Sequence, residues 1–190
     1  MARLLRAEGL EVRTYASAGE LLVTLPSGEP GCVILDVQMP GLNGLELQAR
    51  LATRDDPLPV IFLTGHGHIP DSVRAIQRGA VDFLIKPAES SVLLDAVSRA
   101  IAKDAADRAA RAHRRELKNR YERLTPRERE VFLHLIGGQL NKEVAADLNI
   151  AERTIKLHRA RIFEKLETDS LAELARIAIE LGIGPASAGK

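Results

Sequence analysis

Three polar side chains in the first half of the chain each follow a short apolar run, and their types suit phosphoryl transfer. Asp36, Thr64 and Lys86 supply a carboxylate, a hydroxyl and an ammonium group. A carboxylate can attack a phosphoryl group, and an ammonium and a hydroxyl can then hold the oxygens that it acquires. Pro87 follows the lysine, and a cis Lys86–Pro87 bond would aim its side chain. We therefore predict a phosphoryl-accepting site rather than a hydrolase, because no sequence motif places a base beside Asp36.

A second group of residues, between positions 141 and 166, predicts contact with DNA. A short helix over 141–148, a turn at Asn149-Ile150 and a longer helix over 152–166 form a helix-turn-helix pattern, which places its second helix in the major groove. On a helical wheel Ile155, Ile162 and Leu166 share one face and must be buried. The opposite face carries Lys156, Leu157, Ala160, Arg161 and Glu164. An amphipathic helix with a solvated charged face is the alternative interpretation.

The side chains on and beside this helix divide into base readers and phosphate contacts. Lys156 is a candidate guanine reader, and Leu157 and Ala160 are candidates for contact with thymine methyl groups. Phosphate contacts would position the domain without specifying a sequence. The candidates for them are Lys142, Thr154, His158 and Arg159, and Arg153 and Arg161 complete the expected DNA-binding residues.

The elements of the first half must bring Asp36, Thr64 and Lys86 together. Strands are expected over 10–15, 32–36, 60–64 and 81–85, and helices over 17–25, 44–52 and 69–78. Strands that alternate with helices through short turns predict a doubly wound parallel α/β sheet with right-handed crossovers. Function lies at the carboxyl ends of the strands in such sheets, so the three side chains should share one crevice.

The second half of the chain is expected to be all-α. Thr125 and Glu128 form a capping box with Pro126 at the first helical position, and this helix ends at Gly137-Gly138. A last helix over 170–181 carries an apolar stripe. We divide the chain into an α/β domain over 1–104, a charged helical linker over 105–123, an all-α domain over 124–182 and a disordered tail over 183–190.

Composition and charge exclude several other classes of protein. The 190 residues carry a formal charge of +1, which divides into −3 for residues 1–104, +4 for 105–124 and 0 for 125–190. An aromatic content of 3% without Trp argues against base-stacking platforms and aromatic-lined ligand pockets. A single cysteine, Cys32, excludes an intrachain disulfide and a thiol-rich zinc site. We expect a cytoplasmic protein with no membrane segment, because neither a long apolar run nor a secretory signal is present.

Residues 1–103 resemble the receiver domain of FixJ-type response regulators of two-component systems. The resemblance is carried by residues 35–41 (LDVQMPG), 63–67 (LTGHG) and 79–87 (GAVDFLIKP). It implies a flavodoxin-like fold in which Asp36 is the phospho-acceptor and Thr64 the switch hydroxyl. Lys86 would contact the phosphate, and Phe83 would be the aromatic switch residue.

The same resemblance implies a Mg²⁺ site and a missing strand. The family opens with a strand that ends in a pair of acidic residues, whereas this chain begins inside the expected first helix, over 2–8. We therefore expect an N-terminally truncated receiver in which Asp36 and the backbone carbonyl of Gln38 remain as metal ligands and the acidic pair is absent. Asp55-Asp56 cannot replace that pair, because it precedes a strand and so lies at the opposite end of the sheet. Weak metal binding and poor phosphorylation are the expected consequences.

Residues 124–182 resemble DNA-binding domains of the LuxR/NarL type. The resemblance is carried by residues 124–131 (LTPREREV), 141–145 (NKEVA), 152–158 (ERTIKLH) and 165–166 (KL). The base contacts that it implies fall on Lys156, Leu157 and Ala160, the face that the helical wheel selects. It also implies that the last helix pairs two domains on a two-fold DNA site. The dimerisation residues would be Leu171, Leu174, Ala175 and Ala178.

The leading interpretation is a transcriptional response regulator and not an enzyme. A sensor histidine kinase would phosphorylate Asp36, the homodimer would bind paired half-sites on double-stranded DNA, and RNA polymerase is a possible further partner. The first alternative is a phosphorylation-independent transcription factor whose receiver serves only as a dimerisation or interaction module. A LuxR-type quorum sensor is disfavoured, because only Tyr15, Phe62 and Phe83 could line a ligand pocket before the linker.

Overall fold

The structure is a computed structural model that describes residues 1–65 and 68–185. The chain divides into two compact units, residues 1–109 and residues 110–190. In the described part of the chain, no helix combines the length and the apolar character that a membrane span requires.

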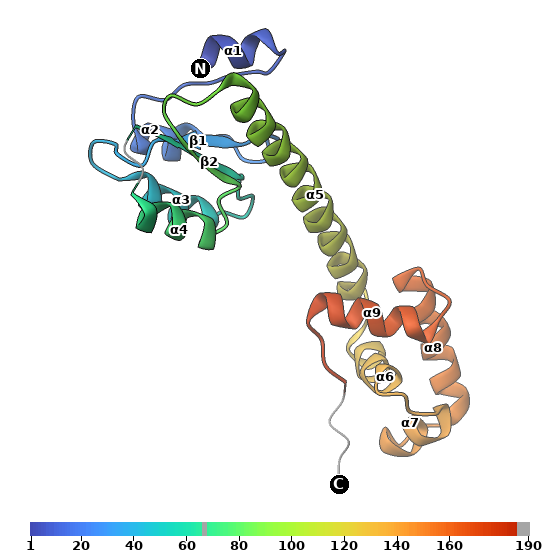
Figure 1. The fold of residues 1–190 in the computed structure, drawn as a ribbon. Coiled ribbons are helices and arrows are strands. Elements are labelled where there is room, and N and C mark those ends of the chain that lie inside the picture. Colours follow the sequence, from blue (N-terminus) through green and yellow to red (C-terminus); the bar gives the residue numbers. More distant parts are fainter. Residues whose placement is uncertain (66–67, 186–190) are drawn as a thin grey trace. The chain divides into compact units, whose positions relative to one another are not determined.

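The first unit is built on a parallel sheet of three strands, β1 (Val33–Leu35), β2 (Val60–Thr64) and β3 (Asp82–Ile85) (Figure 1). The strands lie in the order β1-β2-β3, and the described residues add no further strand to the sheet. Leu35 lies opposite Phe62, which in turn lies opposite Phe83. Because all three strands run in the same direction, their carboxyl ends meet at one edge, as predicted.

Helices cover both faces of this sheet, because successive side chains of a strand point to opposite faces. Val60 and Phe62 of β2 belong to a core that α2 (Ala18–Thr24), α3 (Gly44–Ala52) and α4 (Ile69–Gln77) complete. Ile61 and Leu63 point to the other face, where α1 (Ala2–Ala7) and the first half of α5 (Ser90–Glu122) pack. Both faces of the central strand are therefore buried, which accounts for its unbroken apolar sequence.

The strand expected over residues 10–15 does not form, and that prediction is wrong. Leu10 and Val12 pack against the core beneath α5, so these apolar side chains are partly buried although no strand forms. A strand also requires a neighbouring backbone to pair with. In the described residues the segment pairs with no strand, and its Val12 carbonyl accepts a hydrogen bond from the Arg6 side chain at 3.0 Å instead.

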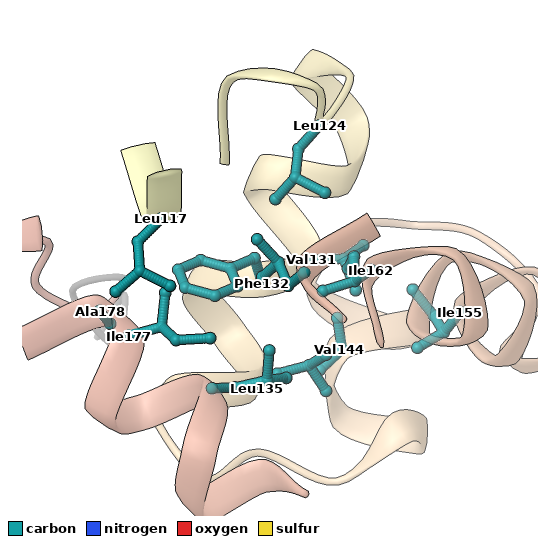
Figure 2. Close-up of a cluster of buried hydrophobic side chains, with 12 residues drawn as sticks. Leu117, Leu124, Val131, Phe132, Leu135, Val144, Ile155, Ile162, Ile177 and Ala178 are labelled. Atoms are coloured by element: carbon teal, nitrogen blue, oxygen red, sulfur yellow. The ribbon is translucent and has the colours of Figure 1, made fainter. Parts of the chain in front are cut away.

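The second unit packs four helices around one apolar core, which Figure 2 shows in close-up. The helices are α6 (Pro126–Ile136), α7 (Asn141–Asp147), α8 (Glu152–Leu166) and α9 (Leu171–Leu181). Thr125 and Glu128 form the expected capping box at the start of α6. The inner face of α8 is the predicted one, because Ile155, Ile162 and Leu166 are fully buried.

Helix α5 covers the expected linker up to Glu122, but its two ends belong to different cores. Arg108 joins the first unit, where it donates hydrogen bonds to Asp104 at 2.8 Å and to the Gly28 carbonyl at 2.8 Å. Leu117 is buried in the core of the second unit, and Tyr121 packs against that core. The interval 105–123 is therefore not a separate element.

The disordered tail is expected to begin at position 183, but Ile183 packs against the core of the second unit. The expected boundary is therefore placed too early in the chain. Residues 186–190 of the tail lie outside the described residues.

Candidate functional sites

The structure brings Asp36, Thr64 and Lys86 together at the carboxyl edge of the sheet. Asp36 follows β1, Thr64 ends β2 and Lys86 follows β3. The Lys86 ammonium donates a hydrogen bond to Asp36 Oδ2 at 2.9 Å, and the Gln38 N–H donates to Asp36 Oδ1 at 3.1 Å. Thr64 is fully buried, and its side chain is a further hydrogen-bond partner of Asp36. A carboxylate, a hydroxyl and an ammonium therefore share one site.

The surroundings of Asp36 hold its pKa below the ordinary value of 3.8. Partial burial raises the pKa of this carboxyl group, but hydrogen bonds from Lys86, the Gln38 N–H and Thr64 lower it by more. The charge of Lys86 acts in the same direction. Asp36 is therefore ionised at neutral pH, as a nucleophilic carboxylate must be.

Gly44 fixes the loop that carries Asp36, and sequence reasoning missed it. Its N–H donates to the Val37 carbonyl at 3.0 Å, and Asn43 caps α3 directly before it. A Cβ atom at position 44 would lie 2.2 Å from the Asp36 carbonyl oxygen and 3.0 Å from the Phe62 ring. Only glycine allows the start of α3 to approach the loop that carries Asp36 this closely. The sequence signal for this close approach is a glycine at the first residue of the helix expected over 44–52.

Phe83 lies on β3 and packs against the core on the α3 and α4 face. Its ring centroid is 5.8 Å from that of Phe62, and the side chain is half-buried. The residue therefore lies between the interior and the surface, where a change of rotamer would change what the surface presents. His66 and Gly67, which belong to the 63–67 motif, lie outside the described residues.

The residues around Asp36 match the requirement of Mg²⁺ only in part. The resemblance of residues 1–103 to receiver domains implies a Mg²⁺ site, and this ion prefers carboxylate, phosphate and water oxygens. Asp36 and the Gln38 carbonyl are the donors expected from the sequence, and the Asp36 carboxylate already accepts from Lys86 and Gln38. In the described residues, no group of three acidic, histidine or cysteine side chains could hold a metal ion. Asp56 is bound to the Gly28 N–H at the other end of the sheet, as its position in the sequence predicts.

Helix α8 presents a polar face to solvent, opposite the residues that fill the core. The exposed residues include Arg153, Lys156, Leu157, Ala160, Arg161 and Glu164, and Lys142 is exposed at the start of α7. Leu157 is 50% exposed and lies among the exposed cations of α8. An apolar side chain beside cations suits a surface that contacts thymine methyl groups and phosphates.

Some of the other expected DNA contacts already have partners within the unit. Arg159 lies over the Phe163 ring at 5.3 Å and reaches Asn141 at 3.4 Å, and it is half-buried. Thr154 and His158 are also half-buried at the edge of the exposed face. Lys156 forms an ion pair with Glu152 at 3.2 Å, a partner that sequence reasoning missed although the i,i+4 spacing indicates it.

The expected dimerisation residues of α9 require a correction. Leu174 and Ala178 are 0% and 2% exposed and belong to the core of their own unit, so they cannot contact a second chain. Leu171 is exposed and Ala175 half-buried, and Ile179, which is 78% exposed, continues their stripe at i+4 spacing. The helical period predicted one apolar face for α9, but the helix has two.

Comparisons with known proteins agree with this geometry. The family profile described as "Response regulator receiver domain" matches residues 1–98, and that of "Bacterial regulatory proteins, luxR family" matches residues 122–178. Nodulation protein W of Bradyrhizobium diazoefficiens is 44% identical over 183 residues, which cover 96% of this chain and 81% of that protein. The transcriptional regulatory protein FixJ of the same organism is 39% identical over 180 residues, which cover 95% and 88% of the two chains.

Two solved structures of similar proteins support the fold over both units. The response regulator StyR matches with a TM-score of 0.80 and 41% identity, over 94% of this chain and 90% of that one. Full-length FixJ from B. japonicum matches with a TM-score of 0.54 and 39% identity, over 95% and 89% of the two chains.

These comparisons confirm a flavodoxin-like α/β domain followed by a helical helix-turn-helix domain. The family is one of transcription regulators with a DNA-binding domain and not one of enzymes. The chain belongs to the response regulators that combine a receiver domain with a LuxR-type DNA-binding domain.

Proposed function

We propose that Asp36 accepts a phosphoryl group from a sensor histidine kinase and that the phosphorylated chain binds paired DNA half-sites as a dimer. The observation that carries this proposal is the contact of Lys86 with Asp36 at 2.9 Å, beside the buried Thr64. Asp36 is ionised, and the lysine and the hydroxyl stand where the acquired oxygens would lie.

The transfer requires little rearrangement of these three side chains. An Asp36 oxygen forms a bond to phosphorus while the bond from phosphorus to the donor breaks. The Lys86 ammonium then donates its hydrogen bond to a phosphoryl oxygen instead of to the Asp36 carboxylate. The Thr64 hydroxyl donates to another phosphoryl oxygen. Asp36 then carries an acyl phosphate with about two negative charges in place of the single charge of its carboxylate, so the site beside Lys86 becomes more negative by about one charge, which can bias a two-state surface.

The output of this change would be DNA binding through α8. Lys156, Leu157 and Ala160 would meet base edges, and Lys142, Arg153 and Arg161 would contact phosphates. Leu171, Ala175 and Ile179 would contact a second copy of the chain, so that two α8 helices read a two-fold site. Such a regulator would work in the cytoplasm, where the DNA is, and its effect on transcription would pass through RNA polymerase.

Phosphorylation is tested by incubating the full chain with radiolabelled acetyl phosphate, with and without Mg²⁺. Wild type should take up label and Asp36→Asn should not. Gel-shift titrations with genomic DNA fragments should then give tighter binding for the labelled wild type than for Asp36→Asn. Labelling of Asp36→Asn to the wild-type level would contradict the assignment of Asp36.

A second candidate function is transcription control without phosphorylation. It is favoured by one observation, the small number of carboxylates that surround Asp36 for a metal ion in the described residues. In that case wild type would bind DNA as tightly as Asp36→Asn, and neither protein would take up label at any Mg²⁺ concentration.

A further inference from the structure

Glu152 is the first residue of α8, and its carboxylate pairs with the side chain that is expected to read DNA. Glu152 Oε1 lies 3.2 Å from Lys156 Nζ, one helical turn along. The two side chains are 47% and 65% exposed, and they lie outside the buried face of Ile155. In a helix-turn-helix protein, the residues at the start of the second helix contact base edges.

A helix-stabilising role for Glu152 is the alternative to a role in DNA binding. An acidic residue in the first turn stabilises a helix, and a Glu–Lys pair at i,i+4 adds to this effect. Ala151, the residue before it, provides no side-chain cap. Glu143 on α7, in contrast, directs its carboxylate to the backbone N–H of Leu140 at 2.8 Å. Among the described residues, Glu152 makes no such backbone contact and pairs instead with Lys156, the side chain that would contact DNA.

A carboxylate in the major groove is repelled by the phosphates, and a hydrogen bond donated by a base can offset this repulsion. The pairing for Glu is the N4 amino group of cytosine, and the pairing for Lys is O6 and N7 of guanine. A lysine ammonium has three N–H donors. One donor of Lys156 can therefore remain on Glu152 while the other two face guanine, and the second oxygen of Glu152 remains available to cytosine.

We propose that Glu152 and Lys156 together read the major-groove edge of one G·C base pair in each half-site. Lys156 donates to guanine, and Glu152 accepts from cytosine N4 and holds the lysine in place. The inference rests on the proposed binding of DNA by α8. It makes Glu152 a specificity residue, in addition to the residues that the family pattern implies.

The substitution Glu152→Gln tests this reading, because it keeps the size of the side chain and removes its charge. A glutamine amide favours adenine over cytosine. The preference for G·C at one base pair should fall by about 10-fold, the order of one good base contact. Total affinity should stay level or rise, because a negative charge is removed from a surface that meets phosphates.

The measurement is selection from a pool of 40-base-pair duplexes with a randomised centre, using the full chain with acetyl phosphate and Mg²⁺. Wild type, Glu152→Gln and Lys156→Ala are compared with the control Glu130→Gln, which removes a carboxylate from an exposed ion pair with Arg127 on α6. Glu152→Gln and Lys156→Ala should lose the preference at the same base pair, and Glu130→Gln should give the wild-type consensus.

The individual affinities of the selected duplexes complete the test. In a double-mutant cycle, the effects of Glu152→Gln and Lys156→Ala on G·C preference should not add, because the two residues act as one reader. The inference is overturned if Glu152→Gln selects the wild-type consensus, or if it changes the affinity for all duplexes by the same factor. If wild type enriches no sequence, the proposed DNA-binding function fails as well, so the two failures are distinguishable.

Discussion

Asp36, the proposed phospho-acceptor, is held in a charge-neutral pair with Lys86. Lys86 and Asp36 lie 2.9 Å apart, with side chains that are about half and one-third exposed. A surface pair of this kind contributes little to stability, because water screens it. The pair matters for position, because the Lys86 ammonium already lies where it could donate to a phosphoryl oxygen on Asp36.

Replacing Lys86 by Met should raise the pKa of Asp36. The fold now lowers this pKa, so the ionised carboxylate favours the folded state above pH 3.8, and this contribution is lost as the pH falls below that value. An NMR titration of the Asp36 carboxyl carbon measures the change directly. Lys103→Met, which removes the partner of Asp107 on α5, is the control and should leave the Asp36 titration unchanged. An unchanged titration in Lys86→Met would show that other groups set this pKa.

Gly44→Ala should destabilise the first unit, because its Cβ atom cannot share space with the Asp36 carbonyl oxygen 2.2 Å away. We expect a loss of about 1–3 kcal/mol in the free energy of unfolding, as for other overpacked sites. Uptake of label at Asp36 should also fall. Gly19→Ala in α2 is the matched control, since its Cβ meets only the Ser17 hydroxyl at 3.8 Å. That variant should gain up to about 1 kcal/mol, and urea denaturation compares the two.

At the scale of elements, α5 is anchored to the first unit through a buried charge. Asp104 is 1% exposed and accepts hydrogen bonds from Arg108 and from the Gly31 N–H at 2.9 Å. Arg108 also donates to the carbonyls of Gly28 and Glu29. One arginine therefore ties the helix to the loop before β1.

Arg108→Met should destabilise the first unit by about 3 kcal/mol, because it removes the cation that pairs with the buried Asp104 carboxylate at 2.8 Å. The double variant Asp104→Asn with Arg108→Met should recover part of this loss, since it removes the buried charge as well. Chemical denaturation of the full chain, followed by a probe in the first unit, measures the three free energies. If Arg108→Met loses no more than an exposed pair would, about 0.5 kcal/mol, the anchoring role of Arg108 is refuted.

Elements with a strong local signal could be predicted from the sequence, and elements that depend on distant partners could not. The bounds of α3, β2 and α8 follow from caps and apolar period, which are properties of the segments themselves. The segment 10–15 has the pattern of a strand, but pairing depends on a neighbour that its own residues do not specify.

The residues of the candidate sites also divide into those that the sequence could place and those that depend on distant partners. The meeting of Asp36 with Lys86 was predictable, because parallel strands align their ends. The burial of Leu174 and Ala178 was not predictable, because period alone does not say which of two apolar faces of α9 meets the core. Nor could the helical period of α5 assign Arg108 to the first unit, since the Gly28 carbonyl to which it donates lies 80 residues away.

At the scale of the whole molecule, each unit has its own core, and the end of α5 belongs to the second. Leu117 is buried in that core, and the Tyr121 ring lies 5.3 Å from the Phe132 ring. The Arg129 guanidinium lies over the Tyr121 ring, 5.3 Å from the ring centroid. A DNA-binding unit that begins at position 124 therefore lacks part of its core.

A fragment of residues 110–190 should fold cooperatively, and a fragment of residues 124–190 should be less stable by at least about 3 kcal/mol, because it loses two packed side chains. Thermal melts followed by circular dichroism compare the fragments. In the full chain, Leu117→Ala should reproduce part of the loss, and Lys118→Ala, on the same turn but exposed, should not. Equal melting temperatures for the two fragments would place α5 outside the second unit.

The Asp36–Lys86 pair also bears on how this regulator can be studied in cells. Glutamate is often substituted for a phosphorylated residue as a permanent mimic of the active state. Here Asp36→Glu would place one negative charge beside Lys86, the same charge that the unmodified aspartate already provides. An aspartyl phosphate would carry about two negative charges in place of that one. We expect reporter transcription in an Asp36→Glu strain to stay at the unstimulated level, so such a strain would serve as a second inactive allele and not as a constitutive one.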